Sequence, residues 1–329
     1  MAFNSASGHN NLPSGNFTPE IFSQKVLKFF RRASVVEDIT NTDYAGEIEN
    51  FGDTVRIIKE PTVTVSTYSR GSVVNPQDLA DDQITMVVDQ ANAFAFKIDD
   101  IEERHSHVNF EALATSSGAF ALKRKYDKTV LQAMSDGAGI AASAVSGTTL
   151  VTTAGAATIG TANAPINIET DDAGINMMLA MARLLDDNSV PEENRWFVAP
   201  PIFYEKVFQA GNKIAEVQVT GDGTSPLRNG LATVGTLAGF RCYKTTALNS
   251  TGGVDQITLT DASATLATDG SENVVLAGHM SSTSTASHIA KTEVVRSTET
   301  FSDVIRGLHV FGQKVLRPEA IVRGVVDFA

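Results

Sequence analysis

The chain has 329 residues, of which 42% are hydrophobic, and 38 acidic residues against 26 Lys and Arg give a net charge of -12. This length and composition allow a substantial core in one large or two moderate domains. The acidic balance excludes a protein whose main task is to grip nucleic acid by neutralising phosphates. No run approaches the roughly 20 apolar residues of a membrane span, and the polar N-terminus lacks the features of a secretory signal, so we expect the product to stay in the cytoplasm.

The sequence carries no motif for catalysis or for cofactor binding. It has neither a phosphate-binding loop of the form G-x-x-x-x-G-K-[ST] nor a G-x-S-x-G nucleophile elbow. A single cysteine, Cys242, excludes an intrachain disulfide and a cysteine-rich zinc site, and its apolar surroundings favour a buried structural thiol. We predict no catalytic, cofactor or metal site.

The one arrangement resembling a metal site is His105-x-His107, which follows the acidic stretch 99–103. Two histidines two residues apart share a face on a strand but not on a helix, and we expect the chain to change from strand to helix here. We therefore interpret this stretch as a solvated acidic corner.

Residues 1–18 are rich in Asn, Ser and Gly and are expected to form a flexible tail. A helix is predicted to follow, with Thr18 as its cap and Pro19 at its first position. Its apolar side chains predict docking on another surface, and its basic cluster is interpreted as a solvated face, with an anionic partner as the alternative. The candidate inter-subunit contacts in this helix are Phe22, Lys25, Val26, Lys28, Phe29, Phe30, Arg31 and Arg32.

From Asp53 onward the period of two predicts strands over 54–58, 62–68, 84–88 and around 94–98, in two pairs that flank a turn region at 69–82. A two-stranded ribbon of this length is marginal in water, so we expect it to lie on another surface. The candidate inter-subunit contacts in the ribbon are Val63, Val65, Tyr68, Arg70, Phe94 and Phe96.

Further elements follow in chain order. Helical patterns predict a long helix over 109–135 and shorter ones over 171–186 and 202–210. Strands are predicted over 195–199, 237–245, 274–276, 308–311 and 320–326. The uncharged stretch 137–168 is interpreted as loop with possible short strands, and 247–270 as a second insertion of low complexity.

This order of features resembles the Hong Kong 97 fold, the α+β fold of tailed-phage capsid proteins. Four strings also resemble coat proteins of short-tailed phages: DITNTDYAGEIENFGDTVRI, VVDQANAFAFKIDD, VPEENRWFVAPPIFYEKV and FSDVIRGLHVFGQKVLRPEAIV. The resemblance implies an N-arm over 1–52, an extended β-hairpin called the E-loop over 53–104, a P-domain with a spine helix over 105–136 and 290–329, and an A-domain over 137–289 with loop insertions at 137–168 and 247–270.

The same resemblance implies a major capsid protein and not an enzyme. Such a subunit associates with itself into hexamers and pentamers of an icosahedral virion shell, which encloses double-stranded DNA without sequence-specific binding. It implies a scaffolding protein during assembly in the host cytoplasm and a portal protein at one vertex. The alternatives are an encapsulin-type bacterial compartment and, in another class, an intracellular hydrolase, which would need a convergent pocket; a secreted adhesin fits less well because no secretory signal is seen.

Overall fold

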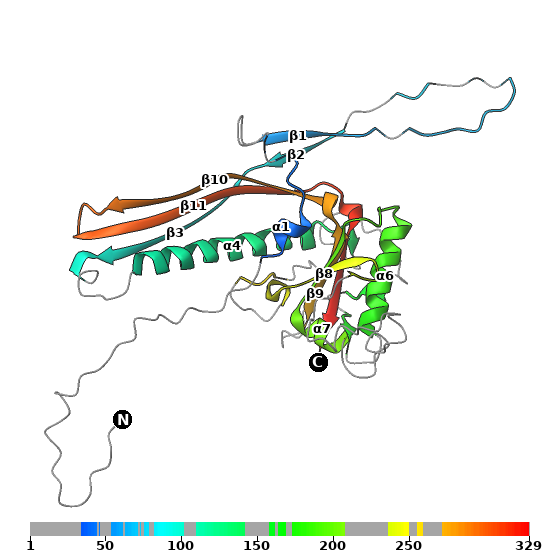
Figure 1. Ribbon diagram of the computed structural model, residues 1–329. Coiled ribbons are helices and arrows are strands. Elements are labelled where there is room, and N and C mark those ends of the chain that lie inside the picture. Colours follow the sequence, from blue (N-terminus) through cyan, green and yellow to red (C-terminus); the bar gives the residue numbers. More distant parts are fainter. Residues whose placement is uncertain are drawn as a thin grey trace, which may run out of the picture.

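The computed structural model describes residues 34–44, 46, 54–61, 63–71, 73, 76–78, 82–101, 110–141, 158–161, 164–168, 173–207, 236–249, 255–258 and 272–328. These residues form a long three-stranded sheet, a seven-stranded sheet at one end of it, and a hairpin that extends away from both (Figure 1). Among them, no helix is both long and apolar enough to cross a membrane.

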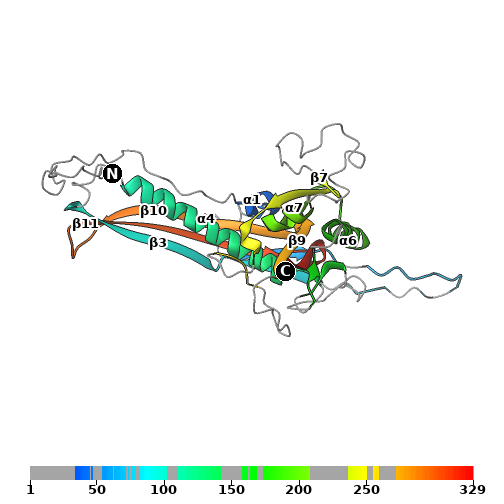
Figure 2. The same ribbon diagram turned by 90° about the horizontal axis from the view of Figure 1, so that it is seen from below.

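The three-stranded sheet is antiparallel and has the order β10-β11-β3, from β3 (Gln90–Asp99), β10 (Thr283–Arg296) and β11 (Ser302–Val315). Helix α4 (Phe110–Asp136) runs along one face of this sheet (Figure 2). Two glycines allow this close approach, because the ring of Phe94 lies against Gly118 of α4 and Gly307 of β11. A Cβ atom at Gly118 would lie 2.7 Å from the Phe94 ring, and one at Gly307 would lie closer still.

The seven-stranded sheet has the order β4-β12-β9-β6-β8-β7, and β5 also pairs with β12. Its strands are β4 (Ile140–Ala141), β5 (Ile166–Asn167), β6 (Arg195–Ala199), β7 (Thr236–Leu237), β8 (Phe240–Lys244), β9 (Asn273–His279) and β12 (Ile321–Asp327).

Helices cover this sheet on both faces. Residues of α6 (Ala173–Asp187) and α7 (Pro201–Val207) pack with Phe197, and residues of α1 (Val36–Ile39) and α4 pack with Trp196 and Val198. Successive residues of a strand point to opposite faces, so β6 is buried along its whole length.

The hairpin pairs β1 (Thr54–Lys59) with β2 (Asp82–Val87), in antiparallel register from Thr54↔Val87 to Lys59↔Asp82. The predicted strand over 62–68 is wrong for the residues described there, 63–68, which are exposed and belong to no strand.

The chain around Phe94 was expected to complete a second pair in this ribbon, but it forms β3 and pairs with β11. Periodicity identifies a strand and its faces but not its partner, which here lies more than 200 residues away in the sequence.

Most other predicted elements are present. The long helix, the helix α6 and the buried strand β6 are confirmed within two residues at each end. The single strand expected over 237–245 is instead a short hairpin, β7–β8, because Ala238 and Gly239 both adopt positive φ and turn the chain. Strand β10 was not predicted.

Sheet membership also cuts across two of the expected domain boundaries. Strand β3 lies inside the range expected for the E-loop but belongs to the sheet with β10 and β11. Strand β12 lies inside the range expected for the P-domain but belongs to the seven-stranded sheet. The division into domains itself stays a prediction.

Short 3-10 turns follow three of the strands: η3 (Thr246–Leu248) after β8, η4 (Met280–Ser282) after β9 and η5 (Pro318–Ala320) after β11. The predicted N-terminal helix, the pair His105 and His107, and most of the two loop insertions lie outside the described residues.

Candidate interaction surfaces

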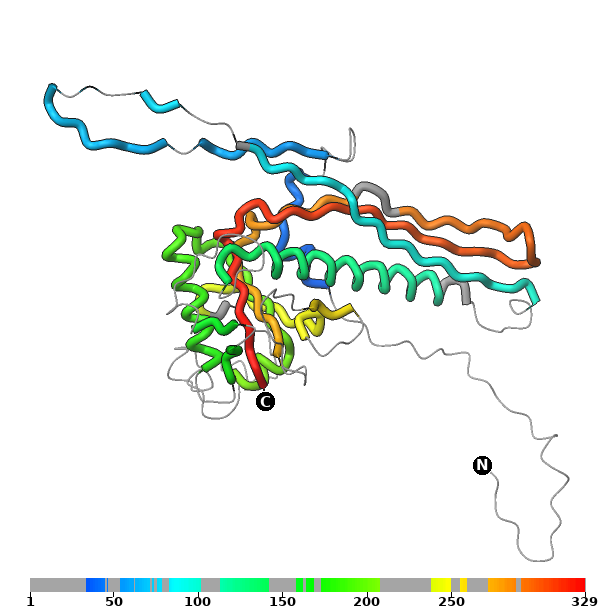
Figure 3. The backbone as a smooth tube through the Cα atoms, turned by 180° about the vertical axis from the view of Figure 1, so that it is seen from behind, coloured from blue at the N-terminus to red at the C-terminus, as the bar shows by residue number. Residues whose placement is uncertain are grey.

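The outer part of the β1–β2 hairpin exposes a run of large apolar side chains. Val63 is 64% exposed, Val65 93% and Tyr68 63%, and Ile58 and Val73 are also open to solvent. The described residues of this hairpin arm extend away from both sheets (Figure 3). Contiguous apolar exposure on this scale is typical of a surface that binds another molecule.

Two features shape this arm. The backbone N–H of Thr64 donates to Oε1 of Gln77 at 2.9 Å, which ties its two sides together beyond the last ladder pair. The candidate Arg70 lies in the turn before Gly71, whose φ of +90° is a conformation that suits glycine. The candidates Val63, Val65, Tyr68 and Arg70 therefore share one exposed arm.

The candidates Phe94 and Phe96 lie elsewhere. Both are half-buried on β3, and their rings stack at 6.1 Å with an interplanar angle of 9°. The Phe94 ring fills the space that Gly118 and Gly307 leave between α4 and the sheet. The structure thus divides the ribbon candidates into an exposed group on the hairpin arm and an aromatic pair that packs within the subunit.

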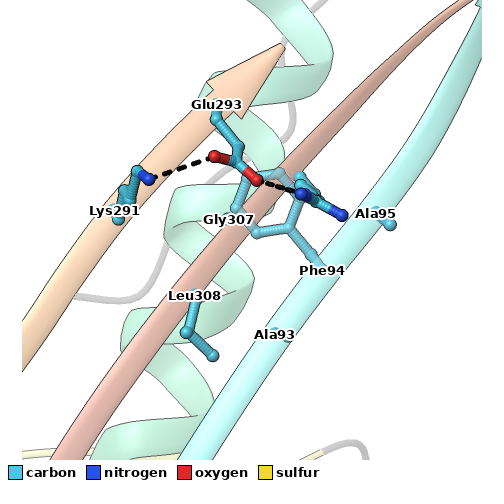
Figure 4. Close-up of a pocket in the computed structure, with 8 residues that line it drawn as sticks. Ala93, Phe94, Ala95, Lys291, Glu293, Gly307 and Leu308 are labelled. Carbon is cyan, nitrogen blue, oxygen red and sulfur yellow. Dashed lines mark hydrogen bonds and ion pairs between the residues drawn. The ribbon is translucent and has the colours of Figure 1, made fainter. Parts of the chain in front are cut away.

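A shallow pocket of about 560 Å³ lies on the three-stranded sheet, lined by Ala93, Phe94, Ala95, Lys291, Glu293, Arg306, Gly307 and Leu308 (Figure 4). Glu293 lies between two cations, with Oε2 3.1 Å from Nζ of Lys291 and Oε1 bonded to Arg306. The hydrogen bonds from Lys291 and Arg306 lower the pKa of the Glu293 carboxyl, so it stays ionised at neutral pH. An apolar floor beside a neutralised charge cluster suits protein contact better than catalysis, because it offers no free acid or base.

A second groove, of about 510 Å³, lies between α4 and β10. Here the ring of Tyr126 lies 4.8 Å from that of Phe311 and 5.5 Å from that of His309, and His309 Nε2 lies 3.0 Å from Ser287 Oγ. Burial raises the pKa of Tyr126 and lowers the pKa of His309, so both groups favour their neutral forms. The neutral aromatic stack is thus part of the packing of α4 on the sheet.

Sequence reasoning missed a second exposed apolar group, at the far end of the three-stranded sheet. Phe301 is 80% exposed, and Ile101 and Val294 are also open to solvent. Beside them Arg296 pairs with Asp100 and, at 3.0 Å, with Asp303, which raises the pKa of its guanidinium. The sequence signal was a Phe within the polar stretch STETFSD. It was missed because the residues before it, which form β10, were not predicted to be a strand.

The remaining candidates are placed as follows. Phe22, Lys25, Val26, Lys28, Phe29, Phe30, Arg31 and Arg32 lie outside the described residues. Cys242, which was expected to be buried, is half-buried against the core that α6 and α7 form with Phe197, with Sγ 3.8 Å from the carbonyl oxygen of Phe240. Within the described part of the chain, no group of three or more His, Cys, Asp or Glu residues could hold a metal ion.

A scan against protein-family models finds no match, and a search of the curated proteins finds no similar sequence. Solved structures, however, resemble the chain over nearly its whole length. A structure from Mycobacterium phage Che8 has a TM-score of 0.73 at 24% identity, covering 94% of this chain and 97% of that one. The asymmetric unit of the bacteriophage PhiM1 mature capsid has a TM-score of 0.66 at 16% identity, covering 95% and 92%.

The capsid asymmetric unit of cyanophage Pam1 has a TM-score of 0.67 at 10% identity and covers 95% of this chain and 97% of that one. The chain therefore has the phage capsid fold, which confirms the α+β Hong Kong 97-like fold that the sequence predicted.

Proposed function

We propose that the chain is the major capsid protein of a tailed bacteriophage. In this role it associates with copies of itself into the hexamers and pentamers of an icosahedral shell around a double-stranded DNA genome. The likeness to phage capsid structures supports the proposal because it covers at least 94% of this chain and at least 92% of each of the three structures compared.

The observation that carries the proposal is the exposed apolar arm of the β1–β2 hairpin. Burying a side chain such as Val65 or Tyr68 is worth about 1.5 to 3 kcal/mol. In the isolated subunit this gain is not realised, because the arm extends away from both sheets (Figure 1). A lattice of identical subunits would supply the missing surface many times over.

The surrounding chemistry favours a structural role over catalysis. The pocket on the three-stranded sheet holds a neutralised ion cluster, and the groove beneath β10 holds a neutral aromatic stack. The pocket supplies no nucleophile with a base within hydrogen-bond reach. In the groove Ser287 Oγ lies 3.0 Å from His309 Nε2, but among the described residues no third group bonds to the His309 ring to orient it as a base. A net charge of -12 also suits a container whose inner wall must not hold its DNA tightly.

The proposal includes two further partners and a location. A separate scaffolding protein guides assembly, as the resemblance to coat proteins of tailed phages implies. A portal protein occupies one vertex, and the shell assembles in the bacterial cytoplasm before it becomes part of the virion. An encapsulin-type compartment, the alternative on the same fold, would close without a scaffold.

Electron microscopy combined with gel filtration tests the proposal. The purified chain should form rings of five or six subunits, sheets or irregular shells when expressed alone, and uniform shells when expressed with the scaffolding protein of its own phage. Uniform shells from the chain alone would favour the compartment. A compact monomer that shows no association at high concentration would contradict both the capsid protein and the compartment protein, and would leave the hydrolase as the remaining alternative.

A further inference from the structure

Three described segments cross side by side between the two sheets, and each turns sharply. Strand β9 continues through η4 into β10, β11 continues through η5 into β12, and α4 leads through Gly137–Gly139 into β4. We call His279–Ser282, Leu316–Ala320 and Gly139 the junction. Backbone bonds tie it together: Leu316 N and Arg317 N both donate to Ser282 O, at 2.8 and 3.1 Å, and Gly139 N donates to Pro318 O at 2.8 Å.

His279 caps the first of these turns with its ring. Its Nδ1 atom accepts from the backbone N–H of Ser281 at 3.1 Å and lies 2.8 Å from Ser281 Oγ. The ring also donates to the backbone carbonyl of Glu193 in the turn before β6. Since Nδ1 accepts, the proton of the neutral ring is on Nε2, and both ring nitrogens are already in use.

The capped turn is linked directly to its neighbour. A guanidinium nitrogen of Arg317, at the start of η5, donates to Ser281 Oγ at 3.2 Å. The contacts therefore run from the His279 ring to Ser281 and on to Arg317. A change in the protonation of the ring can therefore affect both η4 and η5 through two hydrogen bonds.

The charged groups around the ring are predominantly basic. Arg195 lies opposite His279 in the β6–β9 ladder, and its partner Asp186 at 2.7 Å belongs to α6. The positive charge of Arg317 also acts on the ring, and η5 contributes the exposed Glu319. Glu193 meets the ring through its carbonyl group. A second proton on His279 would thus enter a site with two cations close by.

We propose that His279 is a pH-sensitive clasp on the junction between the two sheets. The neutral ring holds η4 against η5. A proton on Nδ1 removes the lone pair that accepts the hydrogen bond from the Ser281 N–H. The ring N–H that results then points at the Ser281 N–H, and the two donors repel each other. The cap opens, the link from Ser281 to Arg317 loosens, and the crossing strands gain freedom to change their relative angle. The inference concerns the subunit itself and does not depend on the proposed shell.

The electrostatics agree with this geometry in sign. Burial is the largest effect on the pKa of His279 and lowers it. The bond to the Glu193 carbonyl is next in size and raises this pKa, while the smaller repulsions from Arg317 and Arg195 lower it, and the net shift is downward. A group whose pKa is lowered on folding contributes stability that is full above its unfolded value of 6.5 and is lost as the pH falls below that value. The clasp therefore holds at neutral pH and weakens in mild acid.

Hydrogen exchange on the full-length chain tests the proposal. Protection factors, corrected for intrinsic exchange, are compared at pH 7.5 and pH 5 for the amides of Gly139, Leu316 and Arg317. For an open state with an ordinary histidine pKa, linkage predicts that protection of these amides falls by up to about 30-fold at pH 5. Amides of the β9–β12 ladder serve as the internal reference and should keep their protection.

Two variants separate this clasp from a general effect of acid. His279→Asn keeps an acceptor for the Ser281 N–H but does not titrate, so its junction should show little dependence on pH. His309→Gln removes another half-buried histidine away from the junction and should retain the full dependence. An acid response in His279→Asn equal to that of the wild type overturns the proposal. If His279→Asn does not fold, the wild type still decides: equal loss of protection in the junction and in the β9–β12 ladder overturns it as well.

Discussion

At the scale of single residues, the packing of α4 on the three-stranded sheet depends on two positions without side chains. The ring of Phe94 occupies the space next to Gly118 and Gly307, and a Cβ atom at either would overlap it. Sequence reasoning took Phe94 for a surface contact because alternation on a strand reports only which residues share a face. The structure shows that this face meets a helix of the same subunit.

We expect Gly307→Ala to destabilise the subunit by about 1 to 3 kcal/mol through overpacking against Phe94. Gly46→Ala is the matched control, because a Cβ atom there has no neighbour within 4 Å, and it should be close to neutral. The midpoint of urea unfolding measures both. In a double-mutant cycle, Gly307→Ala combined with Phe94→Ala should cost less than the sum of the two single changes, and strict additivity would contradict the proposed overlap.

At the scale of elements, the β1–β2 hairpin and the long sheet differ in what supports them. Strand β3 has a backbone partner in β11 and a helix over one face. The outer arm of the hairpin has described residues that are exposed throughout and only short strands at its base. A two-stranded ribbon of this kind is marginal by itself, so its order should depend on neighbours.

Assembly should therefore slow amide exchange across 63–68 and leave β3 nearly unchanged, since β3 is already paired within the subunit. The comparison is made between unassembled subunits and particles. Equal protection of the hairpin arm in both states would mean that it makes no inter-subunit contact.

Substitution tests the same arm by particle yield. Val65→Ser with Tyr68→Ser should leave the stability of the free subunit within about 0.5 kcal/mol, because both side chains are exposed, yet should reduce particle yield at least tenfold. Leu179→Ser is the matched control, as Leu179 is comparably exposed on α6 but remote in the chain from the arm. A similar loss of yield in the control would show that the effect is not specific to the hairpin.

The predicted N-terminal helix carries a third prediction at this scale, argued from the sequence. Its apolar side chains are each worth about 1.5 to 3 kcal/mol when buried, whereas an exposed ion pair is worth about 0 to 1 kcal/mol. Phe29→Ser with Phe30→Ser should thus lower particle yield more than Lys28→Ala with Arg32→Ala. The opposite ranking would favour contact with an anionic partner.

At the scale of the whole molecule, two sheets of different character are joined by the long helix. The seven-stranded sheet is buried on both faces, while the three-stranded sheet has a helix on one face and a shallow pocket on it. Residues of α1 and α4 pack with Trp196 and Leu276, so the long helix connects the two. Such a subunit offers large flat and extended surfaces for repeated contact with its own copies.

We expect the mature particle to contain no covalent links between subunits. Cross-linking of the kind known for this fold needs a lysine in the E-loop. Lys59 and Lys97 are expected near the base of that loop, and between them the only basic residue is Arg70. The single cysteine allows no disulfide network. A denaturing gel of mature particles should show monomers of 35.0 kDa, and a ladder of covalent oligomers would contradict this expectation.

The sequence by itself determined the elements with strong local patterns and the resemblance to phage coat proteins. The amphipathic period of α6, the apolar run of β6 and the long helix could be predicted because each depends on neighbours within a few turns of the chain. Only the tertiary structure decided that β3 pairs with β11, that residues 63–68 lie exposed outside any strand, and that β10 extends for 14 residues. These features depend on contacts between distant segments. In addition, the charged residues Lys291 and Glu293 interrupt the apolar pattern by which β10 could have been recognised as a strand. Which strands pair and which residues are exposed depend on the surfaces that distant segments bring together, and a local sequence pattern cannot predict those surfaces.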